Sequence, residues 1–190
     1  MKENNQHNIT LQVIIVIIVL IILGILGFSI LNNNRHAQRV DIVVSNFDEC
    51  VAAGNSVMES YPGQCRHGDE LFIQNIGNEL EKIDIIRINM PRPTLLIESP
   101  LVIEGNARGP WFSEGSFPIE LIDADGVIIA QGIATVEGDA RTEDFVKFSG
   151  ILEFEKPDSG NKGTLILRKS NPSGEPAFDD ALELPILFGK

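Results

Sequence analysis

The stretch SFPIELIDADGVIIAQGIATV, residues 116–136, indicates the fold class of this chain. Phe117, Ile119 and Leu121 stand at every second position, which is the pattern of a strand with one buried face. Asp125-Gly126 is a strong signal for a tight hairpin turn, and the β-branched run behind it predicts the returning strand. The stretch therefore predicts an antiparallel hairpin.

Short runs of strand-forming residues continue on both sides of this hairpin, separated by Gly, Pro and Asp turns. They lie at residues 85–90, 95–97, 101–107, 145–154, 163–168 and 181–188. We therefore expect an all-β domain at residues 83–188, an immunoglobulin-like β-sandwich of seven or eight strands. The Cys…Trp…Cys pattern of antibody domains is absent, so this sandwich must be stable without a disulfide of its own.

The composition excludes several classes of function. The 190 residues hold 27 acidic and 15 basic side chains, a formal net charge of −12 at pH 7, and such a surface repels the phosphates of nucleic acids. With three His and two Cys in the chain, a zinc site built from several of these residues is close to excluded. We expect no nucleic-acid partner, no metal and no other cofactor.

A long apolar run near the N-terminus predicts a membrane anchor. Residues 13–31, VIIVIIVLIILGILGFSIL, contain no charge and as a helix would span roughly 30 Å, the thickness of a bilayer core. The run is too long for the apolar part of a cleaved signal peptide, and no small-residue cleavage site follows it. We expect a cytoplasmic tail at 1–8, a transmembrane anchor at 9–31 and a polar stalk at 32–39.

The orientation of the anchor follows from its position and from the cysteines. Counted alone, Arg35 and Arg39 against Lys2 slightly favour the opposite orientation by the positive-inside rule. A short tail before an early apolar run is nevertheless the usual layout of a signal anchor, and paired cysteines suit an oxidising compartment. We expect a single-pass protein of the cell membrane with its C-terminal domain outside the cytoplasm.

Residues 40–76 form a separate small unit around the only two cysteines, Cys50 and Cys65. Outside the cytoplasm, two cysteines so placed favour a disulfide, which would stabilise a loop of this size by about 3 kcal/mol. A redox or metal pair and two unpaired thiols are the alternatives. The elements expected in this unit are a strand at 40–44, a helix at 47–53 capped by Asn46, and a strand at 70–73.

The same unit resembles a short two-cysteine motif that recurs in bacterial envelope proteins. The positions that carry this resemblance are Cys50, Val51, Gly54, Asn55, Val57, Ser60, Tyr61, Pro62 and Cys65. The resemblance implies an envelope protein and assigns no chemistry to these residues. A distant likeness to small protease-inhibitor modules leaves an inhibitor as an alternative.

Trp111 and Phe112 lie in a loop-like frame and are the first candidates for a partner contact. Aromatic residues in the loops of a sandwich often bind partners; the alternative, which we favour for Trp111, is that these rings close one end of the core. Glu114 and Asp139 are the other candidates. Asp139 belongs to an acidic group that is either a solvated face or a contact for a cation or a basic partner, namely Glu137, Asp139, Glu143 and Asp144.

Two motifs that suggest chemistry are better explained as turns. Asp123-Ala124-Asp125-Gly126 resembles the start of a calcium loop, but residue 134, where such a loop needs a bidentate Glu, is Ala. Ser173 lacks the frame of a nucleophile elbow and has no suitable His base. We expect no catalytic residue and no metal ligand, and we expect that the chain is not an enzyme.

A set of positions within residues 83–188 carries a family resemblance. They are Ser99-Pro100, Gly105, Ala107, Trp111-Phe112, Glu114-Gly115, Phe117, Asp123, Gly126, Gly138-Asp139, Phe148 and the turn 171–174. Here the chain resembles the immunoglobulin-like domain of bacterial spore germination, which implies a non-catalytic envelope module. Ala140 departs from the resemblance, which would place an aromatic residue there.

Two functions are consistent with these features. The first is a non-enzymatic, membrane-anchored extracytoplasmic module that binds an envelope protein or a peptidoglycan component, linked to sporulation or germination-type envelope processes. The alternative is a small protease-inhibitor-like or envelope-sensor protein that acts through its cysteine unit.

Overall fold

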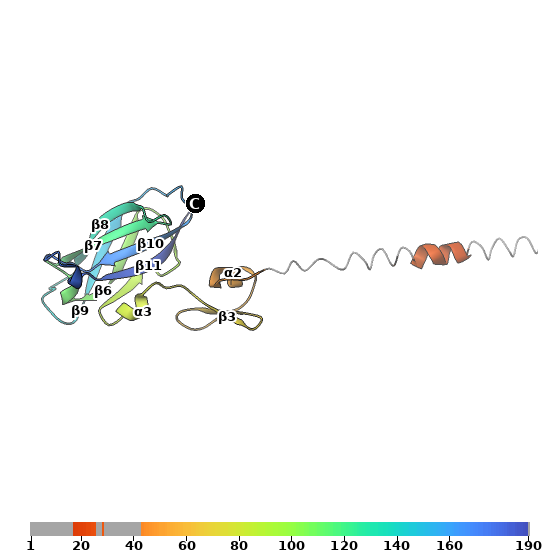
Figure 1. Ribbon diagram of the computed structural model, residues 1–190, viewed down its shortest axis with the longest axis horizontal. Helices are drawn as coiled ribbons and strands as arrows, with labels where there is room; N and C mark the ends of the chain where they lie inside the picture. Colours follow the sequence, from red (N-terminus) through yellow and green to blue (C-terminus); the bar gives the residue numbers. More distant parts are fainter. Residues whose placement is uncertain (1–16, 26–27, 29–42, 190) are drawn as a thin grey trace, which may run out of the picture. The chain divides into compact units, whose positions relative to one another are not determined.

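The computed structural model describes residues 17–25, 28 and 43–189 of the chain (Figure 1). It divides into two units after Val43, and each is described by itself. Of the anchor expected at 9–31, the described residues are helical; the rest of the anchor, the expected tail and the expected stalk lie outside the described residues. Among the helices described, none combines the length and the apolar content that a membrane crossing needs.

The second unit begins with a small module made of one helix and a three-stranded antiparallel sheet, namely α2 (Phe47–Ala52), β1 (Val57–Met58), β2 (Gln64–His67) and β3 (Glu70–Ile73). The predictions of α2 and β3 are confirmed. Strands β1 and β2 are not predicted from the sequence, because β1 has only two residues and β2 consists mostly of polar residues. The strand expected at 40–44 is wrong for Val43 and Val44, which are irregular; residues 40–42 lie outside the described residues.

Helix α2 begins where the sequence predicts because Asn46 caps it. The Asn46 side chain accepts a hydrogen bond from the Glu49 N–H at 2.9 Å. The Glu49 carboxylate in turn accepts hydrogen bonds from the N–H and the hydroxyl of Ser45, at 2.8 and 2.7 Å. In a usual capping box the Glu side chain would bind the N–H of the capping residue itself, Asn46. Here it binds the N–H of Ser45, one residue earlier in the chain.

A short helix, α3 (Glu79–Lys82), leads from the small module into an eight-stranded β domain. The strands of this domain are β4 (Ile86–Met90), β5 (Leu96–Ile97), β6 (Leu101–Arg108), β7 (Ser116–Asp123), β8 (Ile128–Val136), β9 (Phe145–Leu152), β10 (Lys162–Arg168) and β11 (Ala181–Phe188). Two 3-10 turns lie between them, η1 (Gly109–Trp111) and η2 (Pro176–Phe178). The sequence predicts all eight strands to within two residues at each end, but not α3, which is a single turn.

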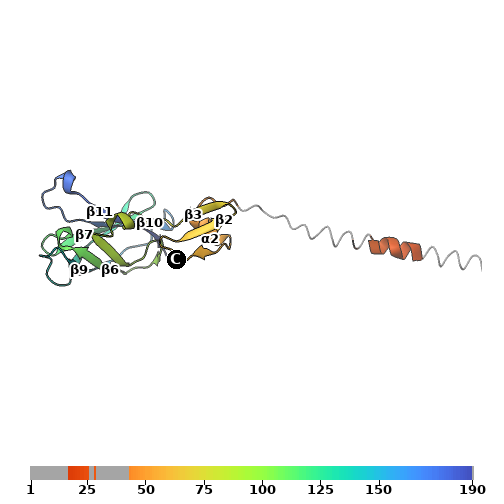
Figure 2. The same cartoon turned by 90° about the horizontal axis from the view of Figure 1, so that it is seen from below.

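The eight strands form one continuous sheet in the order β4-β6-β9-β8-β7-β10-β11-β5. Strand β8 joins its two halves, since it pairs with β7 along most of its length and with β9 only at Thr135 and Val136. The sheet curls, so that β6 and β9 lie in one layer and β10 and β11 in the other (Figure 2). The predicted sandwich is correct in its strand content and layers, but the layers belong to one curled sheet.

A single apolar core fills the space between the layers. Phe117 of β7 and Phe148 of β9 are almost completely buried there, with ring centroids 4.9 Å apart. Strand β6 approaches Phe148 closely because Gly105 has no side chain; a Cβ atom there would lie 2.5 Å from the Phe148 ring. Both cysteines lie in the small module, so packing alone stabilises this core.

Candidate functional site

Cys50 and Cys65 form the expected disulfide, which joins α2 to β2 with the Cα atoms 6.1 Å apart. Both cysteines are fully buried, and Val44, Phe47 and Phe72 pack around them. Because the disulfide is enclosed in the small core of its own module, the geometry supports a structural role over a redox or metal pair.

A buried carboxylate, that of Glu79 in α3, joins the small module to the β domain. It accepts hydrogen bonds from the Tyr61 hydroxyl and from Arg92 Nη1 at 2.8 Å, and with Arg92 it forms an ion pair. The Arg92 guanidinium also lies over the Tyr61 ring, 5.0 Å from its centroid. Burial, and next the hydrogen bond to Glu79, raise the pKa of Tyr61 above its ordinary value, so the hydroxyl stays a donor.

A second contact, made by Asn78 at the start of α3, covers the edge of β11. The Asn78 side chain accepts a hydrogen bond from the Glu183 N–H at 2.8 Å and donates one to the Ala181 carbonyl at 3.0 Å, as a neighbouring strand would. Gln74 Nε2 also donates to Thr94 Oγ1 at 2.9 Å. Through these contacts the small module packs directly on the β domain.

Trp111, the first candidate for partner binding, is fully buried. Its ring meets Phe117 edge-on at 6.4 Å between centroids, and Phe112, which is 9% exposed, lies 5.4 Å from the same Phe117 ring. The turn η1 brings both residues into the core instead of onto the surface. Trp111 is therefore a core residue, the alternative that the sequence favours, and offers no surface to a partner.

The other three candidates, Phe112, Glu114 and Asp139, line one hollow of about 620 Å³, which we call the Glu114 groove. Its walls come from the loop between β6 and β7, from β8 and from the connection between β8 and β9. They consist of Phe112, Glu114, Gly115, Thr135, Val136, Gly138, Asp139, Ala140 and Arg141. The small side chain of Ala140, where the resemblance would place an aromatic residue, is part of this lining.

The two acidic residues of the Glu114 groove differ in how they are held. Glu114 has a φ of 52° because it is the first of the two residues that turn the chain between Ser113 and Ser116, whose backbones are hydrogen-bonded to each other at 3.0 Å. Asp139 accepts a hydrogen bond from the Arg141 N–H at 2.9 Å and lies 3.7 Å from Arg141 Nε. Arg141 is 95% exposed, so solvent screens this pair and both carboxylates remain accessible.

The remaining acidic residues near the groove have structural or solvent-facing positions. Glu143 holds the connection between β8 and β9 through its carbonyl, which accepts a hydrogen bond from Arg108 Nη1 at 2.7 Å. Glu137 and Asp144 are exposed. Of the acidic group expected from the sequence, only Asp139 therefore lines the groove, where it is accompanied by Glu114.

Asp123 is a structural carboxylate of the hairpin between β7 and β8. It accepts hydrogen bonds from the Val127 N–H and the Ser159 hydroxyl, both at 2.8 Å, and from the Asp125 N–H at 3.0 Å. These bonds, first of all that from Val127, hold the pKa of Asp123 below its ordinary value. Both carboxylate oxygens are thus engaged within the protein, and the motif is a turn.

Ser173 is also held within a turn. Its hydroxyl donates to Asn171 Oδ1 at 2.6 Å and accepts from the Glu175 N–H at 3.2 Å. In the part of the chain that the structure describes, no group of three or more His, Cys, Asp or Glu side chains is placed to hold a metal ion.

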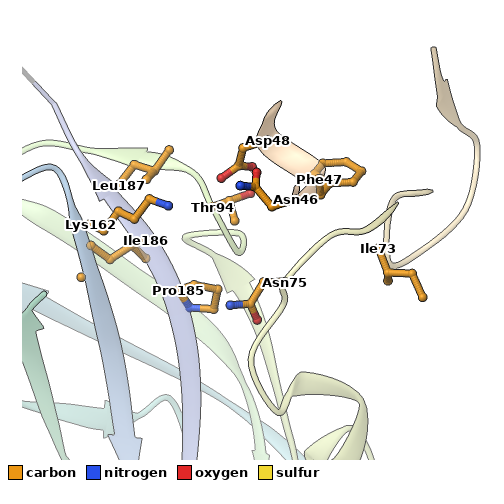
Figure 3. Close-up of a pocket in the computed structure, with 11 residues that line it drawn as sticks. Asn46, Phe47, Asp48, Ile73, Asn75, Thr94, Lys162, Pro185, Ile186 and Leu187 are labelled. Carbon is orange, nitrogen blue, oxygen red and sulfur yellow. The ribbon is translucent and has the colours of Figure 1, made fainter. Parts of the chain in front are cut away.

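A second hollow, of about 260 Å³, lies where the small module meets the β domain, and we call it the seam cavity (Figure 3). Its lining is Asn46, Phe47, Asp48, Ile73, Asn75, Thr94, Lys162, Gly163, Pro185, Ile186 and Leu187. These residues come from five separate segments of the chain. The sequence therefore carries no local signal for this cavity, and none of its residues was a candidate.

Comparison with known proteins identifies one family. Residues 85–175 match the family model of the immunoglobulin-like domain of bacterial spore germination, which confirms the resemblance seen in the sequence. The match begins at β4, extends through β10 and does not include the small module. No curated protein and no solved structure matches the chain significantly.

Proposed function

Since residues 85–175 match the immunoglobulin-like domain of bacterial spore germination, we propose that this chain is a non-enzymatic binding module of the cell envelope. In this proposal residues 9–31 anchor it in the cell membrane, and the part from residue 44 onward lies outside the cytoplasm. The uncharged run 13–31 and the disulfide between Cys50 and Cys65 support that arrangement.

The Glu114 groove is the contact site in this proposal. The observation that carries it is that Phe112, Glu114 and Asp139, selected from the sequence as separate candidates, line one hollow. Two accessible carboxylates favour a basic or hydrogen-bond-donating group on the partner, which is an envelope protein or a peptidoglycan component. The family adds a role in sporulation or germination-type envelope processes.

In this proposal the groove binds its partner without catalysis. Its two carboxylates, those of Glu114 and Asp139, act as charges that contact the partner. The alternative function, an inhibitor or sensor acting through the cysteine unit, is the weaker of the two, because Tyr61 of that unit, although 48% exposed, is engaged with Glu79 and Arg92.

A pull-down of the full chain from membranes of its own cells tests the groove. The double variant Glu114→Gln, Asp139→Asn removes both charges, and we expect it to retain clearly less partner than the unaltered chain. The matched control is Glu70→Gln, Asp69→Asn, which removes one Glu and one Asp charge at two exposed positions, one at the start of β3 and one in the turn before it. Equal retention by the two double variants would exclude the groove as the contact site.

Protease added to intact spheroplasts tests the proposed orientation separately. We expect the protein beyond Gln38 to be digested before the cells are lysed, as a domain outside the cytoplasm would be. Protection of that part until lysis would reverse the orientation and with it the extracytoplasmic role.

A further inference from the structure

The seam cavity is a formed site between two parts of the chain that are packed on each other. Thr94 belongs to its lining, and Gln74 lies between the two lining residues Ile73 and Asn75. The Gln74 side chain donates a hydrogen bond to Thr94 Oγ1 at 2.9 Å. The Thr94 N–H also donates to the carbonyl of Pro185 in β11 at 2.7 Å. Its two walls are therefore connected by direct hydrogen bonds, and a ligand would meet a cavity that needs little rearrangement.

The two walls carry opposite charges. Asp48 of α2 stands on one wall and Lys162 of β10 on the other, and Figure 3 shows the Lys162 side chain extending toward the α2 side. In the described part of the chain, neither side chain forms an ion pair within 4 Å, although Lys162 is close enough to Glu49 to contribute, after the hydrogen bonds from Ser45, to the lowered pKa of that carboxyl group. One carboxylate and one ammonium that have no direct partner among the described residues thus border the same small space.

The surface between these charges is largely apolar. Pro185 and Leu187 of β11 line one side of the cavity, next to Ile186, whose side chain belongs to the core of the β domain, and Phe47 of α2 lies on the opposite side (Figure 3). Ile73 is 58% exposed and stands at the rim. Binding sites for small molecules commonly combine an apolar surface with a few polar groups that orient the ligand.

We propose that the seam cavity binds a small zwitterion with an apolar body, whose ammonium pairs with Asp48 and whose carboxylate pairs with Lys162. A volume of about 260 Å³ is below the range of about 300–1,000 Å³ typical of drug-sized ligands. It suits an apolar amino acid or a short apolar peptide, which share this chemistry. The seam cavity and the Glu114 groove have no lining residue in common, so this proposal and the proposed function can fail separately.

Titration of the full chain in detergent micelles with leucine tests the proposal by calorimetry and by the isoleucine methyl signals. We expect saturable binding that shifts the signal of Ile73, the exposed isoleucine of the lining, and leaves that of Ile133, a similarly exposed residue outside the cavity on β8, unchanged. Lys162→Gln and Asp48→Asn should each weaken leucine binding about three- to fivefold, the upper range for one partly exposed ion pair. The matched controls Lys147→Gln and Asp69→Asn, both at exposed positions outside the cavity, should leave it unchanged.

Blocked ligands assign each charge to its partner. Leucinamide lacks the carboxylate, so its binding should not respond to Lys162→Gln, and N-acetyl-leucine lacks the ammonium, so its binding should not respond to Asp48→Asn. Tighter binding of leucine than of leucyl-leucine identifies a free amino acid as the ligand class, and the reverse order identifies a peptide. The proposal is overturned if neither leucine nor leucyl-leucine binds saturably, if the Ile73 signal does not shift, or if the cavity variants behave like the controls.

Discussion

The carboxylate of Glu79 lies 2.8 Å from Nη1 of Arg92 and is itself only 7% exposed. Glu79 belongs to the helix that follows the small module, and Arg92 to the turn after the first strand of the β domain. Tyr61 of the two-cysteine motif completes the cluster by donating to the same carboxylate. The motif therefore has a structural task in this chain, since one of its residues joins the module to the β domain.

Arg92→Met should destabilise the protein because it leaves Glu79 buried without its cation. Removing one partner of a fully buried ion pair costs about 3–5 kcal/mol. Because Arg92 is 43% exposed, we expect a smaller loss of about 1–3 kcal/mol in the free energy of unfolding. Unfolding in denaturant measures this free energy. The control Arg141→Met breaks a pair that is almost fully exposed and should change stability by less than about 0.5 kcal/mol. Equal effects of the two variants would contradict the role of Glu79.

Trp111→Ala should lower the free energy of unfolding by about 3–5 kcal/mol, the usual effect of deleting a large buried aromatic residue. Trp111→Phe should restore much of this loss, because in the described structure the buried Trp111 Nε1 has no hydrogen-bond partner to lose. Phe178→Ala, at a position that is 55% exposed, serves as the control. A Trp111→Ala protein of unaltered stability that has lost its partner would move Trp111 from the core to the contact site.

Mass spectrometry of the exported protein, digested without reductant, should show a peptide in which Cys50 is linked to Cys65. The double variant Cys50→Ala, Cys65→Ala should be less stable by about 3 kcal/mol, as the chain-entropy model gives for a loop of this length. Complete alkylation of both thiols in the exported protein would contradict the disulfide and weaken the proposed location outside the cytoplasm.

Asp123 should make the stability of the β domain depend on pH under acid conditions. Its pKa in the folded protein is below the ordinary value of 3.8, so its contribution is fully present above that value and is lost as the pH falls through the folded pKa. Asp123→Asn should therefore be less stable than the unaltered chain at pH 7, with a difference that shrinks below about pH 4. Urea unfolding at pH 7 and at pH 3 measures the stability difference between the variant and the unaltered chain. Asp125→Asn, at an exposed position, is the control. A difference that persists unchanged at pH 3 would exclude the carboxylate as its cause.

Most of the β domain is predictable from the sequence because its strands have one buried and one exposed face. The alternation of Phe117, Ile119 and Leu121 is reproduced as fully buried side chains in β7. The curl of the sheet is not predictable, since it depends on β8 pairing with β9 only through Thr135 and Val136. Two-residue β1 and the single turn of α3 are likewise too short to leave a periodic pattern.

The candidate site is predictable only in part. Phe112, Glu114 and Asp139 are recognisable as residues in unusual loop positions, and the structure brings them together at one groove. Trp111 shows the limit of that reasoning, because a loop-like frame in the sequence is a 3-10 turn that directs the ring into the core. The seam cavity depends entirely on tertiary contacts between segments as distant as Asp48 and Lys162.

Photo-crosslinking at the Glu114 groove tests the central claim, that this groove contacts a component of the cell envelope. A photoreactive amino acid replaces Glu114 in the full chain in living cells, and in a second strain it replaces Lys147, an exposed residue on the outer face of β9. The account predicts a discrete adduct with an envelope protein or with cell-wall material from position 114 and none from position 147. Discrete adducts from position 147 with none from position 114 would contradict it.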